Sequence, residues 1–385
     1  MNARMKMFCG TILASAMAFA AAAHGGTCAS IEFKSGGATL RLAEANGAVA
    51  SLLAADCSER LVSAAEAFTL QLLDGKGEPT RLKSSNFTFS HDGGALTWRY
   101  TGKARADGAK PVPPDAGGLV VRMEVSTADG EFHFRPSVEG IPAGMLLEWF
   151  DGPQICVSAD RALYWPYWDG CEVRDFTRRT YRPCRYRSRY DFSDCSLYPG
   201  IAQMQFLAAY ADGAGIYFSA VDDRHTPKGV EWELVDGSAV RLSLQTFCGD
   251  LDADGAWRPK FFYALRAYEG GWMEACEIYR DWVRTLPRFD HPRMRPKWMS
   301  DSPVNLIYPV RGEGLDNLPR DMKPNRYFPY MNAMSAVEKY AKLLDSRIMA
   351  LLMHWEGTAP WAPPYVWPPL GGETALAEFR DALHA

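Results

Sequence analysis

Two segments near the end of the chain carry the side chains best suited to bind and cleave a sugar. Each follows a short apolar run, at 303–310 and at 348–353. Arginine can hold anionic oxygens, aromatic rings can pack on the C–H face of a pyranose, and carboxylates can cleave a glycosidic bond. We therefore predict a carbohydrate site formed by Tyr308, Arg311, His354, Trp355, Glu356, Trp361 and Trp367, with Glu313 and Tyr365 in the same segments.

Glu356 is the candidate catalytic residue of these segments. It lies two residues after His354, so both side chains share one face if the backbone is extended. The alternative is that Glu356 supports another site residue or is solvated. Because the two carboxylates of a glycosidase can come from almost any pair of loops, the sequence identifies no catalytic pair. We expect those residues beyond Ala385.

A second aromatic segment, at 162–176, places an acid beside three rings. Rings that stack on a sugar and a carboxylate that accepts its hydroxyl protons would form a binding loop. The alternative is a plug of aromatic side chains that fills the core at the base of the loop. The residues concerned are Trp165, Tyr167, Trp168 and Asp169.

The segment 174–194 carries seven arginines and three aspartates, with three tyrosines between them. Basic residues with stacking rings are typical of single-stranded nucleic-acid sites, but an export signal described below argues against nucleic acid as a partner. A solvated loop with local ion pairs is one interpretation. An anionic glycan, held by arginine forks on sulfate or uronate groups, is another.

The short sequence "GDLDADGAW" resembles half of a calcium loop, with acids at Asp250, Asp252 and Asp254. The twelfth position, where a bidentate glutamate is required, holds Phe261, so the calcium interpretation fails and a hairpin turn is expected. No nucleophile elbow, phosphate loop, dinucleotide fingerprint or His-Glu-x-x-His occurs. We expect no metal and no cofactor.

The first 25 residues have the features of a secretory signal peptide. Arg4 and Lys6 precede an apolar stretch at 7–23, and small residues at Ala23 suit cleavage. No later segment is apolar over enough residues to span a bilayer. We expect a periplasmic or extracellular protein with no stable membrane span after cleavage.

Export makes disulfides possible for eight of the nine cysteines, since Cys9 lies in the signal. Eight cysteines allow 105 connectivities, so no pairing follows from the sequence. Cys171, Cys184 and Cys195 lie closest together and are the best candidates, although most of the eight could be small buried side chains. The absence of Cys-x-x-Cys argues against zinc and thioredoxin-like sites.

The rest of the chain indicates how these segments are positioned. A 47% apolar content supplies a core, and a net charge of −4 gives no general attraction to nucleic acid or membranes. Short alternating segments bounded by Gly, Asp or Pro predict an antiparallel β-sandwich over 30–268, with one hairpin turning at Asn46-Gly47.

Helical spacing appears first at 272–286, so we expect a linking helix and a proline-rich connector over 269–300. The segment 301–385 then alternates strand, helix, strand, helix, which predicts parallel strands. Two parallel strands cannot cover both faces of their sheet. We therefore expect a multidomain β plus α/β protein that ends after the first two β/α units of an incomplete TIM-type barrel.

The segment 198–234, with "LYWPYWDG" before it and "ACEIYRDWV" after it, resembles a family of secreted proteins with a domain of unknown function, the DUF6259 type. The resemblance covers about residues 140–370. It implies a glycoside hydrolase-like protein with a mutarotase-like β-sandwich and a (β/α)8 barrel. It also implies that "HWEGTAPW" lines a sugar site. No catalytic residue is carried over from the family.

These observations favour an exported glycoside hydrolase that acts on a complex polysaccharide or oligosaccharide, present as an incomplete and inactive chain. An alternative is a carbohydrate-binding or cell-surface structural protein without catalysis. A polysaccharide lyase is a third hypothesis, supported by the arginine-rich segment alone.

Overall fold

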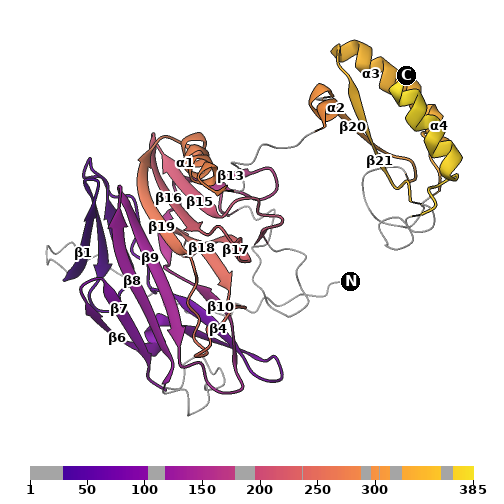
Figure 1. Cartoon of the computed structure of the whole chain (residues 1–385). Coiled ribbons are helices and arrows are strands. Elements are labelled where there is room, and N and C mark those ends of the chain that lie inside the picture. Colours follow the sequence, from indigo (N-terminus) through magenta and orange to yellow (C-terminus); the bar gives the residue numbers. More distant parts are fainter. Residues whose placement is uncertain are drawn as a thin grey trace, which may run out of the picture. The chain divides into compact units, whose positions relative to one another are not determined.

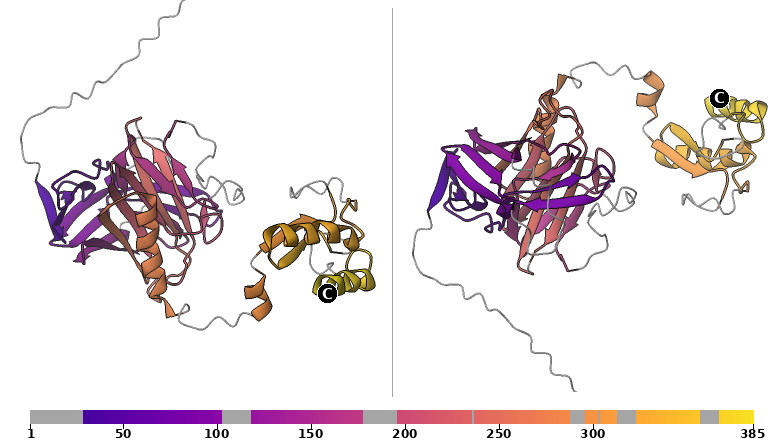
Figure 2. Two further views of the ribbon diagram at one scale, coloured as in Figure 1. Left: turned by 90° about the horizontal axis from the view of Figure 1, so that it is seen from above. Right: turned by 90° about the horizontal axis from the view of Figure 1, so that it is seen from below.

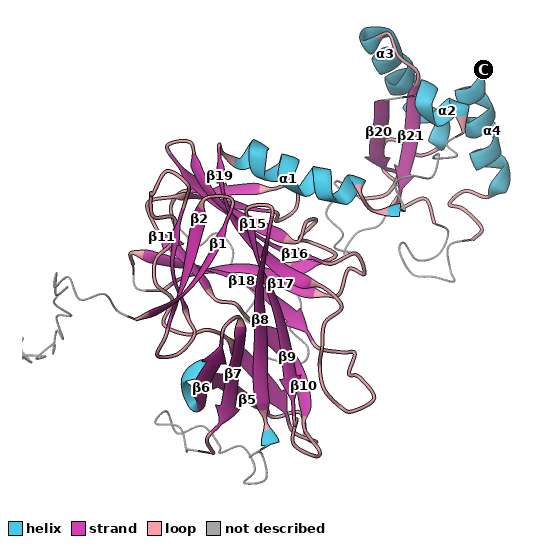
Figure 3. Ribbon diagram, turned by 60° about the vertical axis from the view of Figure 1, so that its left-hand side comes forward, coloured by secondary structure: helices cyan, strands magenta, loops and turns pink. Residues whose placement is uncertain are grey.

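The computed structural model describes residues 29–102, 118–177, 196–235, 237–287, 296–302, 304–312, 323–356 and 367–385 (Figure 1). The contacts within the chain divide it into two compact units, 1–287 and 288–385. The first unit is built almost wholly of strands, and the second mixes strands with helices (Figure 3). The predicted domain limits at 268 and 300 stay predictions.

A large antiparallel sheet forms one layer of the first unit. On β8 of this sheet, alternating apolar residues form a buried face, at Val121, Met123 and Val125. In spatial order its strands are β13 (Cys171–Val173), β12 (Ala162–Trp165), β15 (Phe206–Ala211), β16 (Ala214–Val221), β19 (Phe262–Glu269), β9 (Glu131–Glu139), β8 (Val120–Ala128), β7 (Ala95–Tyr100) and β6 (Phe87–Asp92).

A second antiparallel sheet forms the facing layer. Its order is β14 (Leu197–Tyr198), β17 (Lys228–Leu234), β18 (Ala239–Phe247), β10 (Leu146–Asp151), β4 (Thr69–Leu73) and β5 (Pro79–Lys83), with β11 (Ile155–Ser158) paired to β18. A third, smaller sheet holds β1 (Ser30–Ser35), β2 (Ala38–Ala43) and β3 (Val49–Leu53). Gly47, with φ of 70°, lies in the predicted hairpin between β2 and β3.

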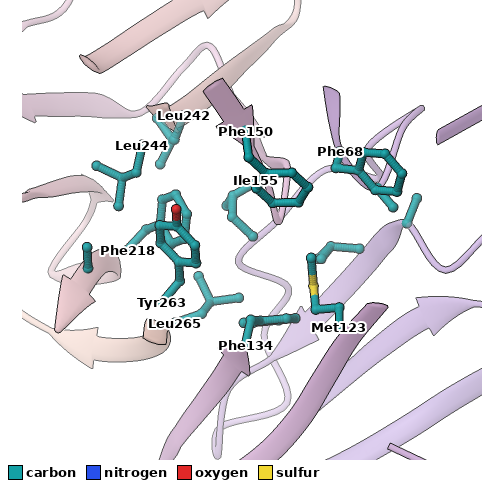
Figure 4. Close-up of a cluster of buried hydrophobic side chains, with 14 of the residues drawn as sticks. Phe68, Met123, Phe134, Phe150, Ile155, Phe218, Leu242, Leu244, Tyr263 and Leu265 are labelled. Carbon is teal, nitrogen blue, oxygen red and sulfur yellow. The ribbon is translucent and has the colours of Figure 1, made fainter. Parts of the chain in front are cut away.

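The main core lies between the two large sheets. Phe150 and Leu242 from the second sheet lie across from Phe134 and Leu265 of the first (Figure 4). Aromatic rings fill much of this space, and Phe68 meets Trp98 edge to face at 5.3 Å. Burying each such side chain contributes roughly 1.5–3 kcal/mol. The predicted antiparallel, β-rich fold is confirmed.

In the first unit, the helix α1 (Trp272–Arg284) packs on the outer face of the first sheet (Figure 2). Ala275 and Tyr279 are its buried residues, and the ring of Tyr279 lies 5.2 Å from that of Phe206 on β15. The helical spacing of the sequence predicted this element. The connector that follows includes a short helix, α2 (Lys297–Asp301), where the sequence indicated none.

The second unit contains two parallel strands, β20 (Val304–Pro309) and β21 (Ile348–Met353). The short 3-10 helix η4 (Tyr330–Ala333) runs into α3 (Met334–Leu344), and α4 (Glu373–His384) closes the unit. Tyr308, Tyr330 and Phe379 form the centre of its core. On the strands, Ile307 and Leu351 are each 48% exposed. The predicted order and parallel pairing are confirmed, while a TIM-type barrel stays a prediction.

Candidate sugar site at two strand ends

The carboxyl ends of β20 and β21 meet at one edge of their sheet. The strands pair in register from Val304 with Ile348 to Pro309 with Met353. Val310 continues the pairing by donating from its backbone nitrogen to Met353 O at 3.0 Å. The residues that follow each strand must therefore lie side by side, although the two segments are more than forty positions apart in the chain.

Arg311, His354 and Glu356 are joined directly at this edge. Arg311 Nη2 donates to the carbonyl oxygen of Glu356 at 2.7 Å, and Arg311 is 7% exposed. His354 Nδ1 lies 3.2 Å from the carbonyl oxygen of Arg311. A carbonyl can only accept, so Nδ1 carries the hydrogen in this contact.

His354 adopts an unusual backbone conformation with φ of 60°. A side chain other than glycine in this left-handed region costs about 1–3 kcal/mol, and such residues gather at functional sites. The turn directs the chain away from β21 so that Glu356 can pair with Pro369 in an isolated bridge. Nothing in the types of the neighbouring residues predicts this conformation.

Two polar atoms at the strand ends are buried without a hydrogen-bond partner in the described part of the chain. They are the hydroxyl of Tyr308 and Oε2 of Glu356. Leaving such an atom unsatisfied costs about 1–3 kcal/mol, which a bound hydroxyl group or water would recover. Burial, with a smaller effect of Tyr327, raises the pKa of Tyr308, so its hydroxyl stays a neutral donor.

Trp355 and Trp367 form an aromatic wall beside these groups. Their rings meet edge to face at 6.3 Å, and Trp367 is 55% exposed. Trp367 Nε1 donates to Glu373 Oε1 at 2.6 Å, which ties the ring to the first turn of α4. Leu370 N donates to Trp355 O at 2.8 Å. The predicted residues Glu313, Trp361 and Tyr365 lie outside the described residues.

The other predicted aromatic segment divides between the core and the surface. Trp165 is buried, stacks on Tyr167 at 4.5 Å and donates from Nε1 to Val230 O at 2.7 Å, so it cannot present its ring to a sugar. For Trp165 the core-packing alternative is therefore correct. Trp168 is 58% exposed, with Asp169 exposed beside it. These two residues can still contact a ligand.

The remaining predictions meet the structure in different ways. No disulfide joins the cysteines that the structure describes. Cys184 and Cys195 lie outside that part of the chain, and so does the arginine-rich segment from Arg178 onward. Asp252 and Asp254 bind Arg258 rather than lying open to a cation. Their loop joins β18 to β19, which belong to different sheets, so the expected hairpin is wrong.

The described residues include no group of three or more His, Cys, Asp or Glu arranged to hold a metal ion. They also contain no helix with the length and apolar character needed to cross a bilayer. The signal-like segment 1–25 lies outside the described residues.

A buried ion pair in the first unit had no signal in the sequence. Lys228 Nζ donates to Asp222 Oδ2 at 2.5 Å, and both side chains are almost completely buried. Burial by itself raises the pKa of Asp222, but the Lys228 ammonium and backbone donors outweigh it and hold the pKa below its usual value. An Asp and a Lys six positions apart in the sequence do not by themselves indicate a buried ion pair.

Comparison with solved structures identifies the fold. The α-N-acetylgalactosaminidase NagBb from Bifidobacterium bifidum in complex with GalNAc matches over 92% of this chain with a TM-score of 0.58 and 12% identity. The same enzyme with Gal-NHAc-DNJ gives a TM-score of 0.60 at 12% identity, again over 92% of this chain. The chain therefore shares its fold with a glycoside hydrolase.

The match covers 56% of the length of that enzyme in both complexes. No protein-family model and no curated protein sequence matches the chain. The resemblance to the DUF6259 type therefore stays a prediction.

Proposed function

We propose that this chain is the sugar-binding part of a glycoside hydrolase-like protein, with its site at the carboxyl ends of β20 and β21. The observation that carries the proposal is the junction of Arg311, His354 and Glu356 at that edge. In β/α barrels the ligand is bound at this end of the strands. The fold shared with an α-N-acetylgalactosaminidase supports a carbohydrate ligand, and GalNAc is the first candidate.

The proposed roles follow from the chemistry of each side chain. Arg311 fixes the two segments through its bond to Glu356 O and places a positive charge at the site. Tyr308 donates and the Glu356 carboxylate accepts, since each has a buried oxygen without a partner in the described residues. Trp355 and Trp367 offer rings against which the C–H face of a sugar can pack.

We further propose that the 385-residue chain binds sugars without cleaving glycosidic bonds. Hydrolysis needs two carboxyl groups about 5–9.5 Å apart across the bond. Among the described residues directly after the two strands, at 310–312 and 354–356, Glu356 is the carboxylate and no second one lies beside it. A carbohydrate-binding protein without catalysis is the alternative that this observation favours.

One titration tests the sugar site. N-acetylgalactosamine and galactose are titrated into the full chain by calorimetry, in parallel with Arg311→Ala and Trp355→Ala. We expect measurable binding that both substitutions weaken by about tenfold or more, because each removes a charged or aromatic contact. Arg347→Ala, which alters an exposed arginine of the same unit, is the control. Equal binding by Arg311→Ala and the unsubstituted chain would rule out this site.

The absence of cleavage needs a separate assay. The chain is incubated with 4-nitrophenyl α-N-acetylgalactosaminide. The reaction is stopped at alkaline pH, and the absorbance of the released nitrophenolate is measured. We expect no release above the rate without protein. Release that disappears in Glu356→Gln would contradict the proposal and assign Glu356 to catalysis.

We also propose export through residues 1–25, on the charge and apolar pattern of that segment. N-terminal sequencing of the protein from the periplasm or medium should begin after Ala23. A protein that keeps Met1 would overturn this proposal.

Binding of sulfated or uronate-containing glycans, measured on the same preparation, tests the proposed role of the arginine-rich segment.

A further inference from the structure

A pocket of about 260 Å³ opens in the first unit, between two connections of the β-sandwich. One wall comes from the turn between β16 and β17, and the other from the long connection between β18 and β19. Side chains that line it and bear on its chemistry are Arg224, Phe247, Asp250, Leu251, Trp257 and Phe261. All belong to the unit that does not contain β20 and β21.

The first wall is held in place by Asp222 at the base of the turn. Its carboxylate accepts hydrogen bonds from the backbone nitrogens of Arg224 at 2.9 Å and Thr226 at 2.8 Å. Lys228 neutralises the carboxylate and donates a further bond to Thr226 O at 2.8 Å. A buried charge that is paired in this way holds the turn, so the backbone of Arg224 is held in place.

The second wall is held by Arg258. Its guanidinium binds Asp252 at 3.0 Å and Asp254 at 2.9 Å, and it reaches Glu139 on β9 at 3.4 Å. Lys260 also pairs with Asp252, at 3.1 Å. These basic groups are therefore already neutralised by carboxylates of the protein, and they leave little positive charge for a ligand.

Two charged side chains of the pocket are uncommitted. In the part of the chain that the structure describes, neither the Arg224 guanidinium nor the Asp250 carboxylate has a hydrogen bond or an ion pair, and both residues are exposed. Apolar residues line the same pocket: Leu251 is 40% exposed, and Phe247 and Phe261 belong to the lining. Besides the paired Arg258, Lys260 and Asp252, the pocket thus offers one unpaired fork of donors, one unpaired carboxylate and an apolar surface.

This combination suits a neutral sugar. Its hydroxyl groups can donate to Asp250 and accept from Arg224, while its C–H face packs on the apolar wall. The volume is slightly below the roughly 300–1,000 Å³ of pockets for drug-sized ligands, which fits a single sugar ring. Arg258 and Lys260 are already paired with Asp252, and the opposite charges of Arg224 and Asp250 cancel, so the pocket has no net attraction for a uronate or sulfated sugar.

We propose that this pocket binds one neutral saccharide unit of a glycan, as a second site separate from the strand ends of the other unit. Its position in the β-sandwich would let the protein hold a glycan chain independently of β20 and β21. The proposal rests on the pocket itself and stands or falls separately from the site of Arg311.

The test uses the full chain with the first site disabled. In an Arg311→Ala background, free galactose, glucose, N-acetylgalactosamine and galacturonate are each titrated by calorimetry. We expect one equivalent of a neutral sugar to bind, and Asp250→Ala or Arg224→Ala to weaken it by about tenfold or more. The matched control is Asp223→Ala, because Asp223 is exposed beside Arg224 but does not line the pocket.

Three results would overturn the proposal. The first is that none of the three neutral sugars binds in the Arg311→Ala background. The second is that Asp250→Ala and Arg224→Ala bind the sugar as tightly as the control Asp223→Ala. The third is preference for galacturonate over every neutral sugar. If Arg311→Ala alone removes all binding, the second site fails while the proposed function stands.

Discussion

Arg311 and Glu356 are joined by a 2.7 Å hydrogen bond from the guanidinium Nη2 of the first to the backbone carbonyl of the second. The bond links the residues just beyond β20 and β21, so it ties together two segments that parallel pairing brings to one edge. Arg311 thereby acts on the shape of the candidate site as well as on its charge.

Arg311→Lys is expected to loosen this edge although it keeps the positive charge. An ammonium lacks the planar fork, so the bond to Glu356 O and the orientation of the neighbouring segment should be lost. A charge-assisted hydrogen bond contributes about 1.5–3 kcal/mol, and we expect a loss of this size in the free energy of unfolding of the second unit. Urea unfolding measures it. Arg347→Lys is the control, and equal losses in the two variants would contradict the interpretation.

The Lys228–Asp222 pair should be costly to break from one side. Lys228→Met leaves the Asp222 carboxylate buried without its cation, which is expected to lower the free energy of unfolding by about 3–5 kcal/mol. The double variant Asp222→Asn with Lys228→Met should lose less than Lys228→Met alone. Arg280→Met, which removes an exposed pair with Glu277, should change stability by less than about 1 kcal/mol. A double variant that is the least stable of the set would refute the argument.

Asp222 also predicts a dependence of stability on acid. Its pKa is lowered in the folded protein, so its contribution is fully present above the unfolded value of about 3.9 and is lost as pH falls through the folded pKa. Asp222→Asn should therefore show a shallower fall of the unfolding free energy over this acid range. Urea unfolding between about pH 2 and pH 6 measures the slope. Parallel slopes in the two proteins would show that Asp222 does not carry the effect.

Trp165 and Trp168 should respond in opposite ways to truncation. Trp165→Ala removes a buried ring and is expected to cost about 3–5 kcal/mol of stability. Trp168→Ala removes an exposed ring and should change stability by no more than about 0.5 kcal/mol. Thermal unfolding separates the two. If Trp168 contacts a glycan, its variant keeps the melting temperature and loses affinity; a large loss of stability would instead make Trp168 structural.

The sequence predicted the local elements because they depend on spacing along the chain. Alternating apolar residues marked the strands, and the spacing of Ala275 and Tyr279 marked α1. The order of elements in 301–385 predicted parallel pairing, which in turn placed Arg311 and His354 at one edge. The resemblance to a glycoside hydrolase-like family pointed to the same class of fold as the later comparison with NagBb.

Tertiary structure alone decided which of these side chains are accessible and which are paired. Trp165 and Trp168 are three residues apart, yet the first faces the core between the sheets and the second faces solvent. The Asp222–Lys228 pair and the pocket beside it arise where connections from different strands approach each other. Burial and charge pairing depend on distances between segments far apart in the sequence. Residue type and spacing determine the elements of this protein, but only their packing sets those distances.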